Sequence, residues 1–298
     1  MWAVYSTLTL AAFLFLLLGG MSIVDALAHA FSTLSTGGFS TRNVSVAAFS
    51  PYIQYVIIIF MILAATNFAL LYSGLTGRFR DFWKNDEFKT YLLVIISATA
   101  FIVSYLIEEG SSAEEAFRIG LFQVVSIITT TGFATTDYTL WALPPVFAIG
   151  TLMFIGGMSG STTGGIKIVR YVILIKSVFL EFRRQLFPDA ILPLRFNSIR
   201  VPESMVFRVI AFVLLYFIIF IIGLFVLLLQ GIDFATAVGA VAATLGNIGP
   251  GFGAVGPAGN FAFFSNEIKY FLSGLMIVGR LEIFTVLILL TTYFWKRY

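Results

Sequence analysis

Long apolar segments alternate with short polar ones along almost the whole chain. A helix that crosses the hydrocarbon core of a membrane needs about 20 mostly apolar residues, and most of these segments approach that length. The pattern therefore predicts an all-α polytopic membrane protein. The predicted spans are Trp2–Leu18, Tyr52–Leu75, Thr90–Ile107, Pro144–Leu180, Met205–Leu229 and Ile268–Phe294.

Three further apolar helices are too short to cross a bilayer, and each lies between two predicted spans. They cover Ile23–Thr33, Ala113–Ile128 and Phe234–Leu245. Each runs into a tetrad with glycine at its third position: TGGF at 36–39, TTGF at 130–133 and NIGP at 247–250. Such self-similarity predicts a repeated unit of span, pore helix, filter loop and span. Glycine lets a loop turn its carbonyl groups toward an axis, and rings of carbonyls replace the hydration shell of an ion.

The fourth predicted span is interrupted. Residues 156–165 read GGMSGSTTGG, with five glycines and four hydroxyl side chains. Broken helices at membrane depth mark ion pathways in transporters, which favours an intramembrane gate. A helix-packing face is the alternative, because Gly156, Gly160 and Gly164 follow a GxxxG spacing. A phosphate-binding loop is disfavoured, because no lysine directly follows the last glycine and no strand is predicted before it.

Composition and charge place the chain in a membrane. It is 59% hydrophobic and 11% charged, whereas soluble domains carry about 25% charged residues. Basic residues gather at 78–89, at 183–200 and at Lys296 and Arg297, and acidic ones at 108–115 on the opposite side if the spans alternate. The positive-inside rule then makes the basic side cytoplasmic, including the C-terminus. This placement accounts for the net charge of +3 without a nucleic-acid partner.

Residues with catalytic or metal-binding chemistry are scarce. The chain has no cysteine and one histidine, His29. A zinc site needs several histidine or cysteine ligands, so none is expected. The predicted spans offer no histidine, cysteine or aspartate pair for an intramembrane enzyme, and no enzymatic activity is predicted. His29 is interpreted as a packed or hydrogen-bonded residue of the first short helix.

Motifs spread over the chain carry a resemblance to a known family. They are HAFSTLSTGGF at 29–39, VSIITTTGF at 125–133, the stretch 156–170, ATLGNIGPG at 243–251 and GRLE at 279–282. Over nearly its whole length the chain resembles the membrane subunits of the Trk/Ktr/HKT superfamily of potassium transporters. The resemblance implies potassium uptake through repeated units around a central ion pore. It also implies a place in a bacterial or archaeal cytoplasmic membrane.

The resemblance further implies residue roles and partners. A potassium filter would comprise Thr36, Gly37, Gly38, Thr130, Thr131, Gly132, Asn247, Ile248 and Gly249. A gate would comprise Gly156, Gly157, Gly160, Ser161, Thr162, Thr163, Gly164, Gly165 and Arg280. Potassium is then the substrate, and the chain itself holds no cofactor. The family works in membrane lipid as a homodimer on cytoplasmic nucleotide-binding regulatory subunits of the TrkA or KtrA type.

One departure from the family concerns the number of units. The family builds its filter from four, whereas this chain shows three, at 1–75, 76–180 and 181–298, which resemble the second, third and fourth. We therefore expect either a C-terminal fragment or a first unit supplied by another chain. In plant relatives the first filter residue influences the choice between potassium and sodium. A sodium-permeable transporter and a non-conducting scaffold consequently stay open as alternatives.

Simpler roles exist for the same residues. The alternative for the filter glycines is that they only terminate helices, as glycine commonly does at a helix C-terminus. Arg280 and Glu282 fall within the last predicted span, where a charge needs a partner. The resemblance implies that Arg280 faces the pore and meets the gate. The alternative is a structural pairing, for instance with a carbonyl of that loop.

Overall fold

The computed structural model describes residues 2–190, 192–289 and 291–296 of the chain, so Arg297 lies outside the described residues. Within them, helices dominate, as predicted, and one short hairpin is present. The α-helices are α1 (Trp2–Leu18), α2 (Ile23–Leu34), α3 (Pro51–Ala64), α4 (Phe68–Leu75), α5 (Arg80–Lys84), α6 (Asp86–Glu108), α7 (Ala113–Ile128), α8 (Leu143–Leu152), α9 (Ile168–Leu186), α10 (Glu203–Leu229), α11 (Phe234–Gly246), α12 (Asn266–Arg280), α13 (Ile283–Leu289) and α14 (Thr292–Trp295). Short 3₁₀ turns are η1 (Ser45–Ala48), η2 (Tyr138–Leu140) and η3 (Gly253–Val255), and the strands are β1 (Arg195–Phe196) and β2 (Ile199–Arg200).

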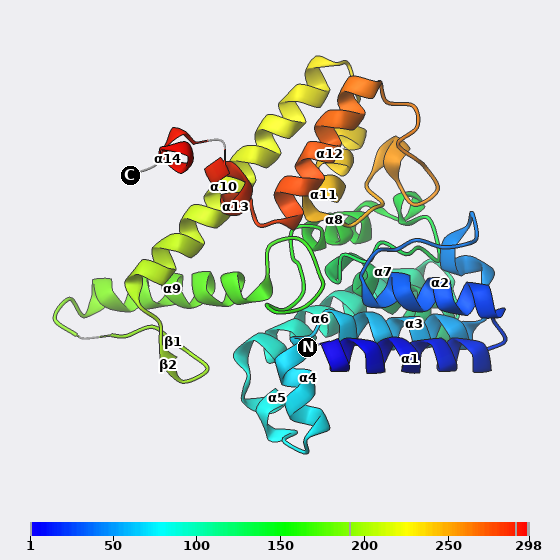
Figure 1. Cartoon of the computed structure of the whole chain (residues 1–298), viewed down its shortest axis with the longest axis horizontal. Coiled ribbons are helices and arrows are strands. Elements are labelled where there is room, and N and C mark those ends of the chain that lie inside the picture. The colour runs from blue at the N-terminus through cyan, green and yellow to red at the C-terminus, as the bar shows by residue number, and fades with distance from the viewer. Residues whose placement is uncertain (1, 191, 290, 297–298) are drawn as a thin grey trace.

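The three short helices α2, α7 and α11 begin in the same way. Each follows a capping residue in extended conformation whose side chain accepts a hydrogen bond from the backbone N–H three residues later. The capping residues are Ser22, Ser112 and Asp233. Such caps satisfy N–H groups that a helix cannot pair internally. Each short helix packs beside the long helix that precedes it, as α1 with α2 and α10 with α11 show in Figure 1.

The long helix that follows each filter loop is broken. α3 and α4 bend by 106° across residues 65–67, and α12 and α13 bend by 116° across residues 281–282. α8 and α9 are likewise separate helices, which confirms the interruption predicted within Pro144–Leu180. The spans predicted for Tyr52–Leu75 and Ile268–Phe294 therefore each contain a break that was not predicted, and each is a bent pair of helices.

Local capping accounts for the two unexpected breaks. The Asn67 side chain accepts hydrogen bonds from the N–H groups of Ala69 and Leu70, and so starts α4 as a new helix. Asparagine is among the best residues for this role. Glu282 has a φ of +57°, a left-handed conformation that ends α12.

Among the residues that the structure describes, two helices are long and apolar enough to cross a bilayer alone. They are α6 and α10, with mean hydropathies of 2.1 and 3.3. The described part of the chain contains up to four such spans if each bent pair is counted as one. α1 and α8 are apolar but shorter, with 17 and 10 residues. Their crossing of the membrane stays a prediction.

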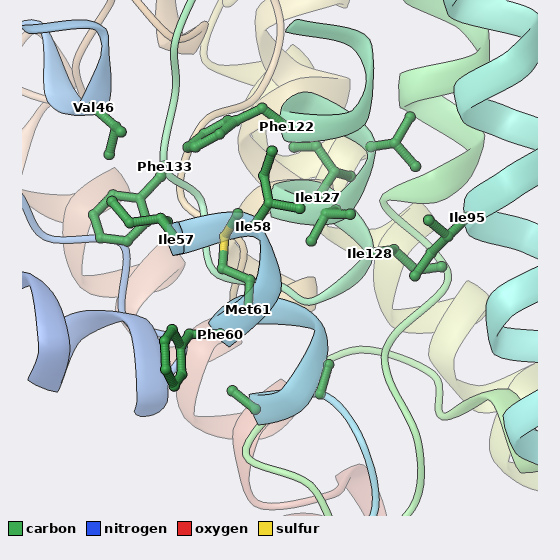
Figure 2. Close-up of a cluster of buried hydrophobic side chains, with 14 of the residues drawn as sticks. Val46, Ile57, Ile58, Phe60, Met61, Ile95, Phe122, Ile127, Ile128 and Phe133 are labelled. Carbon is green, nitrogen blue, oxygen red and sulfur yellow. The ribbon is translucent and has the colours of Figure 1, made fainter. Parts of the chain in front are cut away.

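The largest hydrophobic core lies where α3, α6 and α7 meet. Figure 2 shows Ile57 and Met61 of α3 facing the cluster that holds Ile127 of α7, all 1% exposed or less. Phe133, which directly follows the second filter glycine, lies beside Ile57 in the same cluster and is fully buried. The second filter loop is therefore anchored in the core by its own aromatic residue.

Candidate functional site

The three filter loops follow the same backbone path. Each tetrad begins in the left-handed region, with φ of +53°, +52° and +54° at Thr36, Thr130 and Asn247. The N–H of the second residue of each tetrad donates to the carbonyl five residues earlier, at 2.7, 3.0 and 2.8 Å for Gly37, Thr131 and Ile248. This is the pattern by which a left-handed residue ends a helix. The helix-ending residue is thus the first of each tetrad, not the glycine.

The glycines at the third position of each tetrad also have positive φ, but they do not end the helix. Their φ values are +68°, +82° and +118° at Gly38, Gly132 and Gly249. A Cβ added to Gly38 would lie 2.0 Å from the Thr131 carbonyl oxygen, and one added to Gly132 would lie 1.9 Å from that of Ile248. The interpretation that these glycines only terminate helices is therefore wrong. Gly38 lets the first loop lie directly on the backbone of the second, and Gly132 lets the second lie directly on the backbone of the third.

Further contacts tie the segments beyond the glycines together. The Ala134 N–H donates to Ser45 Oγ at 3.2 Å, and the Val46 N–H donates to the Ala134 carbonyl at 3.2 Å. The buried Tyr138 hydroxyl donates to the Gly251 carbonyl at 2.8 Å. The first loop is thereby joined to the second, and the second to the third.

The stretch 156–165, which we call the gate loop, is not helical and lies in the middle of the molecule between α8 and α9 (Figure 1). A helix-packing face is therefore wrong as an account of its glycine spacing. The N–H of Gly156 donates to the Ile166 carbonyl at 2.8 Å, so the two ends of the loop meet. Gly160 and Gly165 adopt φ of +74° and +66°, which their turns require.

The gate loop touches all three filter loops. The Thr36 hydroxyl donates to the Thr162 carbonyl at 3.0 Å, and the Gly164 N–H donates to the Thr130 hydroxyl at 2.7 Å. A Cβ on Gly164 would lie 2.5 Å from the carbonyl oxygen of Gly246, which directly precedes the third tetrad. The gate loop therefore closes against the start of each tetrad.

The break between α3 and α4 provides the seat of the gate loop. Ending α3 leaves the Ala64 and Ala65 carbonyls free, and these accept hydrogen bonds from Thr162 Oγ1 at 3.1 Å and from the Met158 N–H at 2.9 Å. Asn67 Nδ2 donates to the Ser159 carbonyl at 2.6 Å. A continuous helix would offer none of these groups, because its carbonyls bond within the helix.

Hydroxyl groups hold the gate loop internally. Thr163 Oγ1 accepts from the Gly157 N–H at 3.2 Å and lies 2.9 Å from Ser161 Oγ. The Lys167 ammonium donates to the Thr163 carbonyl and, at 2.7 Å, to its hydroxyl. Lys167 therefore braces the loop from its C-terminal end.

Charged side chains line a cavity of about 260 Å³ beside the gate loop. Lys167, Arg280 and Glu282 contribute to its wall together with residues 159–165. Glu282 pairs with Arg170 at 2.7 Å. Among the described residues, Arg280 has no carboxylate within ion-pair distance, and it forms no hydrogen bond to a loop carbonyl. It lies at the end of α12 beside the break, not inside a continuous span.

The outer end of the first filter loop is held by Asp25 of α2. Its carboxylate accepts hydrogen bonds from Thr41 at 2.5 Å and from Arg42 at 2.9 Å. The hydrogen bond from Thr41, with further ones from Ser22 and Arg42, lowers the pKa of Asp25 below its ordinary value of 3.8. His29 is fully buried, and its ring nitrogens lie within hydrogen-bond distance of the Asp25 backbone carbonyl and of Ser40 Oγ, as expected of a packed helix residue.

Two site residues escaped the sequence analysis. Asn67 carried a detectable signal, since Thr66–Asn67 is a capping dipeptide inside an apolar run. Glu87 carried only a weak one. It resembles any acidic residue at the start of a helix, yet it is buried and contacts the gate loop.

Comparisons with known proteins agree on one family. Residues 1–295 match the family described as "TrkH: Cation transport protein". The "Trk system potassium uptake protein TrkH" of Salmonella typhimurium is 36% identical over 301 residues, which are 100% of this chain and 62% of that protein. The protein of the same name from Vibrio parahaemolyticus is 37% identical, with 99% and 62% covered. The crystal structure of the potassium transporter TrkH from Vibrio parahaemolyticus superposes with a TM-score of 0.93 at 36% identity, over 99% of this chain and 64% of that one. This likeness confirms the predicted fold class of repeated units in an all-α polytopic membrane protein.

Proposed function

Because the chain belongs to the TrkH family of cation transport proteins, we propose that it takes up potassium through a filter made by its glycine loops. The chain spans 62% of the length of the curated relatives described above. One observation carries the proposal most strongly. Three loops with the same backbone path converge, and two glycines lie on the carbonyls of a neighbouring loop with no room for a Cβ. Converging backbone carbonyls are the groups that replace the hydration shell of potassium.

The proposed filter role extends to the first three residues of each tetrad, nine in all, with potassium as the substrate at their carbonyls. The gate loop would block the pathway on one side of the filter, because it contacts the start of each tetrad. Arg280 would add an electrostatic barrier there, since its charge lies beside the loop without a carboxylate partner among the described residues. Removing the loop would then open the pathway.

The proposed setting is a bacterial or archaeal cytoplasmic membrane, with the C-terminus on the cytoplasmic side. The basic segments 78–89 and 183–200 support this orientation. They are also the surfaces on which nucleotide-binding regulatory subunits would dock under a homodimer. The units 1–75, 76–180 and 181–298 would then form three of the four sides of one pore per subunit.

Reconstitution into liposomes tests the proposal. Radioactive rubidium would be followed into potassium-loaded vesicles that hold the chain within its complete natural reading frame, with and without added regulatory subunit. We expect uptake above that of protein-free vesicles, reduced by unlabelled potassium more than by sodium. Equal competition by the two ions would favour the sodium-permeable alternative, and no uptake in either condition would contradict the proposal.

A further inference from the structure

Glu87, in the first turn of α6, contacts both the gate loop and the start of α9. Its Oε1 accepts a hydrogen bond from the Ser159 N–H at 2.6 Å and another from the Val169 N–H at 3.1 Å. The residue is 4% exposed. One carboxylate oxygen therefore joins Ser159 of the gate loop to the beginning of α9, the helix that follows the loop.

α9 depends on this contact because it has no cap of its own. Lys167 occupies the capping position, and its side chain makes no capping hydrogen bond. A helix begins with unpaired N–H groups and a partial positive charge, so a carboxylate from another element stabilises it. Glu87 supplies that group to Val169. Charge-assisted hydrogen bonds of this kind are about twice as strong as neutral ones.

Asp86, the neighbouring residue, holds the β1–β2 hairpin. The hairpin turns through Asn197 and Ser198, both left-handed with φ of +48° and +66°. The Asp86 N–H donates to Asn197 Oδ1 at 2.7 Å, and Asp86 Oδ2 accepts from the Asn197 N–H at 3.2 Å. Lys176 of α9 also pairs with Asp86 at 2.5 Å. Hairpin, α9 and gate loop thus meet at two consecutive residues.

We propose that the first turn of α6 couples the β1–β2 hairpin to the gate loop. Asp86 binds the hairpin turn through its hydrogen bonds with Asn197. Glu87 acts as the positioning residue that holds the gate loop in place against the filter loops. The inference rests on the proposed gate function. Asp86 and Glu87 lie on the same helical turn. A displacement of the hairpin would therefore also displace the Glu87 carboxylate that bonds Ser159 and Val169.

The test measures the loop directly and does not require ion flux. The chain has no cysteine, so Ser159→Cys introduces a single reactive thiol whose side chain is exposed while its backbone bonds Glu87. Its modification rate by a maleimide would be compared in E87Q and in N197G, which keeps the left-handed turn but removes the side-chain acceptor. D81N is the matched control, because Asp81 bonds Ser73 and neither the hairpin nor the loop.

We expect E87Q to raise the labelling rate about tenfold, since it turns two charge-assisted hydrogen bonds into weaker neutral ones. We expect N197G to raise it about threefold, since it removes the side-chain oxygen that accepts a hydrogen bond from the Asp86 N–H. The double variant should label faster than the S159C parent by less than the product of the two factors, about thirtyfold, because the effects of coupled sites do not simply multiply. Rates equal to those of D81N in both variants would overturn the proposal. An increase in E87Q alone would overturn the coupling to the hairpin. If the unmodified protein took up no rubidium, the proposed function would be contradicted, whereas the labelling result would stand.

Discussion

Gly132→Ala is the substitution that most sharply probes the filter. Gly132 has a φ of +82°, and a Cβ there would lie 1.9 Å from the Ile248 carbonyl oxygen. The left-handed conformation costs an alanine about 1–2 kcal/mol. Overpacking against fixed backbone adds about 1–3 kcal/mol and displaces the neighbouring loop. We therefore expect a shift of the filter carbonyls that relaxes or abolishes discrimination between rubidium and sodium.

Gly110→Ala separates the two contributions. Gly110 has a φ of +96°, but an added Cβ would meet nothing within 4 Å. The control pays only the conformational cost, so the two variants should differ by about 1–3 kcal/mol in stability. For a chain of this size that is a difference of several degrees in melting temperature, about 2–4 °C per kcal/mol.

The assay combines rubidium uptake with sodium competition in proteoliposomes, alongside thermal unfolding of the same preparations. Gly110→Ala should retain the rate and selectivity of the unmodified protein, whereas Gly132→Ala should lose selectivity. If Gly132→Ala matched Gly110→Ala in uptake, sodium competition and melting temperature, the filter assignment would be refuted.

Three further predictions concern the gate and the outer loop. Deleting residues 157–164 should raise rubidium flux in a folded protein, because Gly156 and Gly165 already lie in contact and can be joined; unchanged flux would count against a gate. Arg280→Ala should raise flux about tenfold, since a cation about 10 Å from a fixed charge is destabilised by about 1–2 kcal/mol at an effective dielectric of about 20; a change in protein yield alone would favour a structural role. The lowered pKa of Asp25 contributes stability that is present above its ordinary value of 3.8 and lost as the pH falls through the folded value. Thermal unfolding from pH 6 to about pH 2 should show a smaller acid loss in Asp25→Asn, and parallel curves would refute this.

The features of the fold that depend on local chemistry could be predicted from the sequence. The short helices are marked by caps such as Ser112, and the tetrads by glycines with a fixed spacing, so their existence and repetition were predictable. The interruption at 156–165 was predictable because five glycines in ten residues cannot sustain a lipid-facing helix. These features depend on neighbours along the chain.

Hydropathy did not reveal the breaks after α3 and α12, and the first of them is stabilised by distant partners as well as by its local cap. Apolar residues flank both, so hydropathy alone runs through them. The α3 break is stabilised because the gate loop, about ninety residues later, accepts and supplies the hydrogen bonds at Ala64, Ala65 and Asn67. The role of Glu87 is equally tertiary, since its two partners lie 72 and 82 residues away.

Locating the bound ion tests the central claim most directly. Crystals grown with thallium, which substitutes for potassium and scatters anomalously, would show where the cation binds. The account predicts an anomalous peak among the carbonyls of the three tetrads, close to Gly38, Gly132 and Gly249, and its loss in Gly132→Ala. A peak elsewhere, with none at the tetrads, would contradict it.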